Sequence, residues 1–178
     1  LTTKKRKQVI KGMRHSGKYL PMILKMLLEA GMPLDLVYMV SAESNFNVRA
    51  RSKKSAVGLW QFIASTGRLY GLKINRWIDE RRDPILSTKA AITYLKHLYG
   101  IFGDWELAMA AYNTGEGRVK RAIKLAKRKG QKHNFSSLRL PRETKNYVPA
   151  IMALSVIYKN PERYGFGHVK KMPSMDET

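Results

Sequence analysis

The sequence contains no cysteine among its 178 residues. This absence excludes disulfide bonds, cysteine-based zinc sites and thiol catalysis. Histidine is also scarce, and the four that occur show neither an HExxH motif nor the i,i+4 spacing of paired metal ligands. They are His15, His97, His133 and His168. We therefore expect no metal site and no cofactor.

Long hydrophobic runs are absent as well. No apolar stretch approaches the roughly 20 residues that a bilayer-spanning helix requires, so we expect no membrane span in this chain. The N-terminal residues 1–6 (LTTKKR) are basic, but no hydrophobic signal-peptide region follows them. The chain does not begin with methionine. We expect an excised domain, with any signal or membrane anchor outside it.

Acidic residues are few. Lys and Arg number 34 against 13 Asp and Glu, which gives a net charge of +21 and predicts attraction to polyanions in general. Charge alone does not choose between nucleic-acid phosphates and carboxylate-bearing polymers. The 44% apolar and 26% charged content is ordinary for one folded domain with a sizeable core, and we expect a monomer.

Apolar spacing predicts helices nearly throughout the chain, with at most a minor β element, so the expected fold class is all-α. Proline and aspartate mark the expected helix starts. These starts are Pro21, for a helix that stops at Gly31, Pro33, the Asp83-Pro84 pair, for a helix to about Phe102, Asp104, and Pro141. Glu116 is expected in the first turn of a basic helix that ends near Lys129, and Pro149 is expected to kink the last helix.

Glu43 follows a nearly wholly apolar run, residues 34–42 (LDLVYMVSA), at the end of the helix that starts at Pro33. Burial disfavours a charged carboxylate, so we expect a raised pKa for Glu43 and a proton available near neutral pH. A general acid that cleaves a glycosidic bond needs this property. The alternative is a solvated or paired carboxylate at a helix end.

Three further segments occur in order with Glu43 and resemble the sequence blocks of a known family. With residues 43–47 (ESNFN) they are residues 58–62 (GLWQF), 111–117 (AYNTGEG) and 143–149 (ETKNYVP). Together they resemble the soluble-type, goose-lysozyme-like lytic transglycosylases, which cleave bacterial peptidoglycan. The membrane-bound lytic transglycosylase D branch is the nearest, through residues 58–72, 81–84 (RRDP) and 137–155.

This resemblance implies a helical lysozyme-like domain over residues 17–165, between a basic N-terminal extension, 1–16, and a C-terminal tail, 166–178. It also implies a bacterial cell-envelope location, periplasmic or exported, with outer-membrane attachment in a longer protein. The implied partner is the glycan strand of peptidoglycan rather than a specific nucleic acid. A single glutamate, here Glu43, would protonate the bond between N-acetylmuramic acid and N-acetylglucosamine. The same residue would then deprotonate the 6-hydroxyl, which closes a 1,6-anhydro ring.

The resemblance carries further site residues over position by position. Ser52 would lie near the muramic acetamido group, and Gln61 would orient the sugar near the acid. The other expected substrate-binding residues are Tyr112, Asn113, Glu143 and Tyr147. Ser44, Trp60 and Glu116 are additional candidates. Trp60 either packs under the site or stacks on a sugar, and Glu116 is expected to act structurally.

The loop after Glu43 departs from the family pattern in its charge. Four basic residues occur there: Arg49, Arg51, Lys53 and Lys54. They are either solvated or attract stem-peptide carboxylates. Two other functions stay open at this point. Water could intercept the intermediate, as in a hydrolytic lysozyme, or the net charge could indicate a nucleic-acid-binding module of low specificity.

Overall fold

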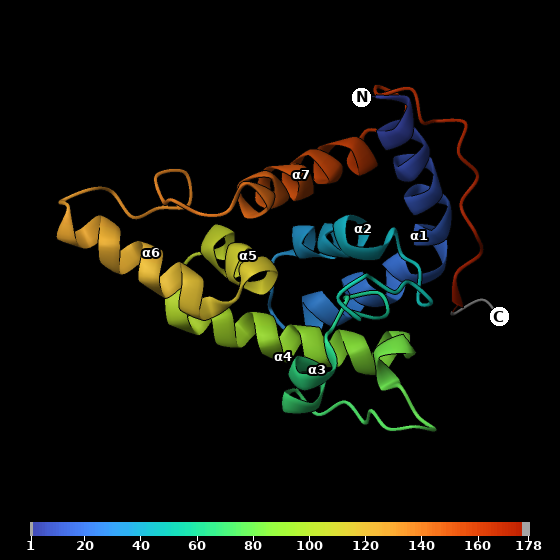
Figure 1. The fold of residues 1–178 in the computed structure, drawn as a ribbon. Coiled ribbons are helices and arrows are strands. Elements are labelled where there is room, and N and C mark those ends of the chain that lie inside the picture. Colours follow the sequence, from blue (N-terminus) through green and yellow to red (C-terminus); the bar gives the residue numbers. More distant parts are fainter. Residues whose placement is uncertain (1, 176–178) are drawn as a thin grey trace. The chain divides into compact units, whose positions relative to one another are not determined.

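The computed structural model describes residues 2–175. Within that range the chain forms seven α-helices and two short 3-10 helices with no β-strand, which confirms the all-α expectation (Figure 1). Three isolated antiparallel bridges, Arg51–Val57, Val57–Phe62 and Ile74–Asp79, are the minor β element. The chain divides into two compact units, described separately below: a first unit up to Ile92 and from Ile151 onward, and a second unit from Thr93 to Ala150.

The first helix, α1, spans Thr3–Glu29. The prediction that it begins at Pro21 is wrong, because Pro21 lies inside it. The helix begins instead after Thr2, whose hydroxyl accepts from the Lys5 amide. An internal proline costs about 3 kcal/mol through the lost hydrogen bond and the ring clash. The helix continues because buried side chains recur at helical spacing on both sides of the proline: Val9, Met13, Ser16, Tyr19, Met22, Ile23 and Leu27.

The middle of the first unit is a second helical segment that packs against α1. It consists of the 3-10 helix η1, Leu34–Val37, and the helix α2, Tyr38–Ser44, and α1 contacts both. The predicted start near Pro33 is confirmed. The Ser41 hydroxyl lies 2.8 Å from the Tyr158 hydroxyl, and Gly12 leaves the room that this phenol occupies. Burial raises the pKa of Tyr158, so the phenol stays neutral and acts as a buried packing and hydrogen-bonding group.

Helix α3, Ala64–Leu69, and the 3-10 helix η2, Glu80–Arg82, complete the short elements of the first unit. Helix α4 spans Pro84–Phe102, as predicted. The Asp83 carboxylate accepts from the amides of Ile85 at 2.9 Å and Leu86 at 2.7 Å, which satisfies two first-turn donors. The predicted cap and first-turn proline are confirmed.

The second unit contains α5, Trp105–Thr114, and α6, Glu116–Arg128, which pack on each other. Asp104 caps α5 as predicted, with its carboxylate 2.9 Å from the Leu107 amide. Gly115 separates the two helices at a φ of +90°. The last helix, α7, spans Arg142–Lys159 and contains Pro149; the expected kink stays a prediction.

The two ends of the described chain pack on each other within the first unit. The Arg6 guanidinium lies 4.6 Å from the Phe166 ring centroid and donates to the Gly165 carbonyl. The Met172 amide donates to the Arg14 carbonyl at 2.8 Å. Helix α1 continues through residues 16 and 17 without a break. The domain boundaries at 16/17 and 165/166 stay predictions, and the last three residues of the expected tail lie outside the described residues.

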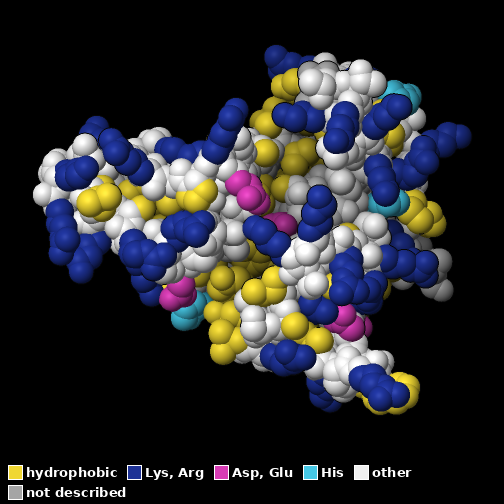
Figure 2. All heavy atoms as spheres, in the orientation of Figure 1, with side chains coloured by type: hydrophobic (Ala, Val, Ile, Leu, Met, Phe, Trp, Pro, Cys, Tyr) yellow, Lys and Arg dark blue, Asp and Glu magenta, His cyan; other side chains and the backbone are white. Residues whose placement is uncertain are grey.

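Lys and Arg are the prevailing charged side chains on the molecular surface in view. Figure 2 shows them in dark blue, scattered across this face between white and yellow areas, with only a few magenta Asp and Glu side chains among them. A surface of one predominant sign attracts anionic partners over about a Debye length, roughly 8 to 10 Å at physiological salt.

Candidate functional site

Glu43 is the penultimate residue of α2, on the last turn of a helix whose first four residues, 38–41, are buried. Met39 and Val40 are fully buried, whereas Glu43 is half-buried. The helix ends abruptly because Asn45 and Phe46 both adopt the left-handed conformation, at φ of 51° and 56°. Such a conformation is costly for phenylalanine and is tolerated here because the Phe46 side chain is buried in the core. Glu43 is therefore attached to a rigid element.

Ser44 joins the end of α2 to the Gly58–Phe62 segment. Its buried hydroxyl donates to the Leu59 carbonyl at 2.8 Å. Gly58 in this segment has a φ of +86°, and a Cβ there would lie 1.8 Å from the Arg81 carbonyl oxygen. Only glycine fits this close backbone approach. Two of the four predicted sequence blocks are thus in direct contact.

Gln61 holds the loop that follows Glu43. Its amide nitrogen donates to the carbonyls of Gly58 at 2.9 Å and Ala50 at 3.2 Å. Gln61 itself has a φ of 51°, a strained conformation of the kind that often occurs at functional sites. Ser52 lies exposed in the same loop, and its hydroxyl accepts from the Ala56 amide at 3.1 Å.

Trp60 is fully buried, and Phe62 is nearly so. The Trp60 indole donates to the Thr88 hydroxyl at 2.9 Å. Two roles were expected for Trp60, and its burial supports packing beneath the site. A ring without exposed surface presents no face to a ligand, so the expected alternative, stacking on a sugar, does not fit this structure.

The second unit positions another group of predicted residues. Tyr112 and Asn113 lie in the last turn of α5, and the Tyr112 ring packs against Tyr94 with centroids 5.1 Å apart. The Asn113 side-chain oxygen accepts from the Thr144 hydroxyl at 2.9 Å. Thr144 is buried and follows Glu143 directly. The AYN and ETKNY blocks are therefore in contact through Asn113 and Thr144.

Glu143 and Tyr147 lie one turn apart on α7. Glu143 is exposed in the first turn, where a carboxylate is favoured by the helix dipole, and Tyr147 is half-buried. Glu116 accepts from Lys120 at 2.8 Å and lies 3.3 Å from His97. The hydrogen bond from Lys120 lowers the pKa of Glu116, with a smaller effect from His97. These contacts agree with the structural role expected for Glu116.

The predicted site residues thus divide between the units. The first unit holds Glu43, Ser44, Ser52, Trp60 and Gln61, and the second holds Tyr112, Asn113, Glu116, Glu143 and Tyr147. Three supporting residues were missed: Arg81, Thr88 and Thr144. The only sequence feature that could have indicated Arg81 and Thr144 is their position inside recognised blocks. Their contacts, with backbone carbonyls and with an amide side chain, leave no pattern in the sequence.

Between residues 2 and 175, no group of three or more His, Asp or Glu side chains is arranged to hold a metal ion. Over that range no helix combines the length and apolarity that crossing a bilayer requires.

The sequence profile of the Transglycosylase SLT domain matches residues 22–135, which include Glu43, Gln61, Tyr112 and Asn113. The chain belongs to this family. The predicted resemblance to this family is therefore confirmed.

Individual SLT-domain relatives extend the match. The chain is 47% identical over 161 residues to the membrane-bound lytic murein transglycosylase D of Escherichia coli K12, covering 90% of this chain and 35% of that protein. It is 36% identical over 121 residues to the peptidoglycan transglycosylase gp16 of Escherichia phage T7, covering 66% of this chain and 9% of that protein. The chain spans about a third or less of the length of these relatives.

Among solved structures, a lytic transglycosylase has a similar fold. It is an inactive variant of the lytic transglycosylase Slt from Pseudomonas aeruginosa, with a TM-score of 0.61 and 23% sequence identity. The match covers 83% of this chain and 24% of that one. At this identity the comparison establishes the helical fold and nothing about individual residues.

Proposed function

We propose that this SLT domain is the catalytic part of a lytic murein transglycosylase, which cleaves the bond between N-acetylmuramic acid and N-acetylglucosamine. The observation that carries the proposal is Glu43, held on the last turn of α2 by the Ser44 bond to Leu59, within a chain that matches the family. The 47% identity to a protein named lytic murein transglycosylase D supports the same substrate class.

In the proposed reaction, Glu43 protonates the glycosidic oxygen and the N-acetylglucosamine side departs. The muramic ring passes through an oxocarbenium-like or oxazolinium species. Glu43, now ionised, removes the proton of the 6-hydroxyl of the same ring, and that oxygen bonds to C1. The nucleophile and the electrophile belong to one sugar, so closure is intramolecular and is favoured by several kcal/mol, within the range of well-oriented reactions.

The other predicted residues would bind and orient the glycan. Gln61 uses its amide nitrogen internally, so its side-chain oxygen is the group suited to accept from a sugar hydroxyl. Ser52 is exposed and presents a hydroxyl to the acetamido group. We propose that Tyr112, Asn113, Glu143 and Tyr147 also contact substrate.

The wider expectations follow from the same proposal. A murein-cleaving domain acts in the bacterial cell envelope, on glycan strands. We also propose residues 17–165 as the catalytic domain and a monomer as its working form. These proposals concern a domain that matches only part of its relatives.

The decisive experiment is product analysis on purified sacculi. Digestion followed by mass spectrometry should give muropeptides one water lighter than lysozyme products, because the 6-hydroxyl rather than water captures C1. Products of full hydrolytic mass would show a lysozyme on the same scaffold. No released muropeptides from a folded protein would contradict glycan cleavage itself.

Replacement of Glu43 with glutamine tests the acid. The amide keeps the shape and removes the transferable proton, so release of muropeptides should fall by at least about a hundredfold, as for loss of a general acid. Glu29→Gln is the matched control, because Glu29 is exposed on α1. The idea is refuted if the two variants turn over equally. The raised pKa expected for Glu43 stays a prediction, which the pH profile of the wild type tests.

A further inference from the structure

The tip of the loop between α3 and η2 carries a large exposed aromatic side chain. Trp77 is 82% exposed, and its neighbour Ile78 is 48% exposed. Soluble surfaces normally contain single exposed apolar residues, but an indole this open beside a second large apolar side chain is characteristic of a contact surface. Residues 72–79 are called the Trp77 hairpin below.

The Trp77 hairpin has a defined turn. Ile74 and Asp79 form an antiparallel bridge, and the Asn75 amide donates to the Ile78 carbonyl at 2.8 Å. The Asn75 side-chain oxygen accepts from the amides of Trp77 at 2.7 Å and Ile78 at 2.8 Å. This Asx-type turn fixes the backbone that presents both apolar side chains.

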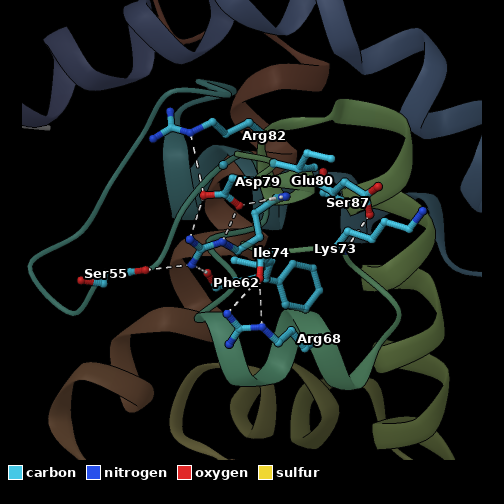
Figure 3. A network of polar contacts seen from close by, with 12 residues as sticks. Ser55, Phe62, Arg68, Lys73, Ile74, Asp79, Glu80, Arg82 and Ser87 are labelled. Atoms are coloured by element: carbon cyan, nitrogen blue, oxygen red, sulfur yellow. Dashed lines mark hydrogen bonds and ion pairs between the residues drawn. The ribbon is translucent and has the colours of Figure 1, made fainter. Parts of the chain in front are cut away.

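The base of the hairpin is bound firmly to the first unit (Figure 3). Arg81 forms a bidentate pair with the Asp79 carboxylate at 2.7 and 2.8 Å, and it also donates to the carbonyls of Ser55 and Phe62. Arg68 donates twice to the Ile74 carbonyl. The hairpin is thus a supported projection, so little ordering cost remains for a binding event.

The side-chain oxygens of Asn75 and Asp79 accept hydrogen bonds from within the hairpin and its support. The oxygen of Asn75 binds two amides, both Asp79 oxygens bind Arg81, and a Glu80 oxygen accepts from the Lys73 amide at 2.6 Å. Apart from Asn75, the exposed side chains between residues 73 and 78 are apolar or cationic. The cations are Lys73, Arg76 and Arg82, all exposed, and the Arg76 guanidinium lies 4.8 Å from the Trp77 ring centroid.

We propose that the Trp77 hairpin docks on the surface of an anionic lipid bilayer. An indole and a branched aliphatic side chain suit the headgroup boundary, where one part of the surface is apolar and the next is wet. The surrounding arginine and lysine side chains complement lipid phosphates. A glycan strand is a poorer fit, because the side-chain oxygens of Asn75 and Asp79, which could accept from sugar hydroxyls, already accept other hydrogen bonds.

This docking adds to the proposed catalysis and uses none of its residues. It would hold the first unit at a membrane surface through an interfacial contact. Over residues 2–175 no helix is able to span a bilayer, so the contact proposed here is peripheral.

The test is co-sedimentation with vesicles of phosphatidylcholine containing about a third phosphatidylglycerol, because the lipid charge sets the attraction. Trp77→Ala/Ile78→Ser should bind at least about tenfold more weakly than the wild type, since both side chains would lose their burial at the interface. The matched control is Leu28→Ala/Met152→Ala, which removes two other exposed apolar side chains of the first unit without changing net charge. Circular dichroism checks that each variant is folded.

General attraction of a basic protein is the competing explanation, and salt separates the two. The difference between wild type and the hairpin variant should persist at high salt, because apolar insertion is not screened. Quenching by brominated lipids should fall in Trp77→Phe, since the other two tryptophans are less accessible: Trp60 is fully buried, and Trp105 is half-buried and stacked on Tyr99. The proposal is overturned if the hairpin and control variants bind alike, if quenching is undiminished in Trp77→Phe, or if the hairpin variant instead loses binding to sacculi alone.

Discussion

At the scale of single residues, Gly58 decides whether the GLWQF segment can approach the RRDP segment. Its α-carbon lies against the Arg81 carbonyl, where a side-chain carbon would stand 1.8 Å from the oxygen. The obstacle is backbone and cannot rotate away. The family pattern predicted the glycine at this position, but the partner that requires it was visible only in the folded chain.

Gly58→Ala should destabilise the protein by about 3 kcal/mol or more, from the left-handed φ together with overpacking. Gly71→Ala is the matched control, because Gly71 has a similar φ of +89° with nothing within 4 Å of the added carbon. Gly71→Ala should lower the free energy of unfolding by only about 1 to 2 kcal/mol, the cost of the left-handed conformation alone. Urea unfolding measures both. Equal losses would show that the Arg81 carbonyl moves aside.

Trp60 shows the limit of residue patterns at this scale. A tryptophan in a glycan-cleaving motif suits either core packing or sugar stacking, and only its complete burial and its bond to Thr88 distinguish them. Thr88 lies 28 residues away in sequence, so no local pattern connects the two.

At the scale of elements, the Arg81–Asp79 ion pair supports the connection from α3 to η2. Asp79 also caps η2 by accepting from the Arg81 amide. The hydrogen bonds from the Arg81 side chain hold the pKa of the Asp79 carboxyl below its usual value, and Arg82 adds a smaller effect. The ionised form is therefore favoured in the folded state relative to the unfolded chain.

The sign of the pH dependence follows from this lowered pKa. The contribution of Asp79 to stability is complete above its unfolded pKa of about 4 and is lost as the pH falls through the lower folded value. Asp79→Asn should therefore be less stable than the wild type near neutral pH, with a difference that shrinks as the solution becomes acidic. Urea unfolding across the acid range measures this. A difference independent of pH would mean that Asp79 acts through its shape or neutral hydrogen bonds.

Helix boundaries also belong to this scale. The starts at Pro33, Asp83-Pro84, Asp104 and Pro141 were predictable, because caps and first-turn prolines act over three or four residues. The prediction of a start at Pro21 was wrong because distant contacts, rather than a local signal, decide the conformation there. Packing of the α1 face outweighs the local preference of one proline, and that packing depends on contacts with segments such as α2 and the C-terminal residues.

At the scale of the whole molecule, the net charge of +21 sets long-range attraction but does not direct it. The four basic residues after Glu43 are all exposed: Arg49, Arg51, Lys53 and Lys54. Their loop is closed by the Arg51–Val57 bridge and by the Ser52 bonds to Ala56. The charges are thus solvated on an ordered turn near the proposed acid in sequence.

Changing these four residues to glutamine should weaken binding to purified sacculi. The difference in binding between wild type and variant should shrink as salt rises, because exposed charges act through screened attraction. The control changes Lys124, Lys127, Arg128 and Lys129 to glutamine, which removes the same charge from the end of α6. Pull-down across a salt series measures both. If both variants lose the same amount of binding, only net charge matters. If the difference between wild type and the loop variant persists at high salt, the loop makes specific contacts. Exposed charges contribute little to stability, so both variants should stay folded.

The sequence by itself determined the all-α class, most helix starts, the family and the order of the site blocks. These depend on short-range periodicity, on capping and on residues that a family pattern records in one dimension. Tertiary structure decided the rest: Pro21 lies inside a helix, Trp60 lies in the core, Gly58 packs against Arg81, and Trp77 is exposed on a turn held by hydrogen bonds. Each depends on which distant backbone or side chain becomes a neighbour, and burial and close contact exist only after the chain has folded.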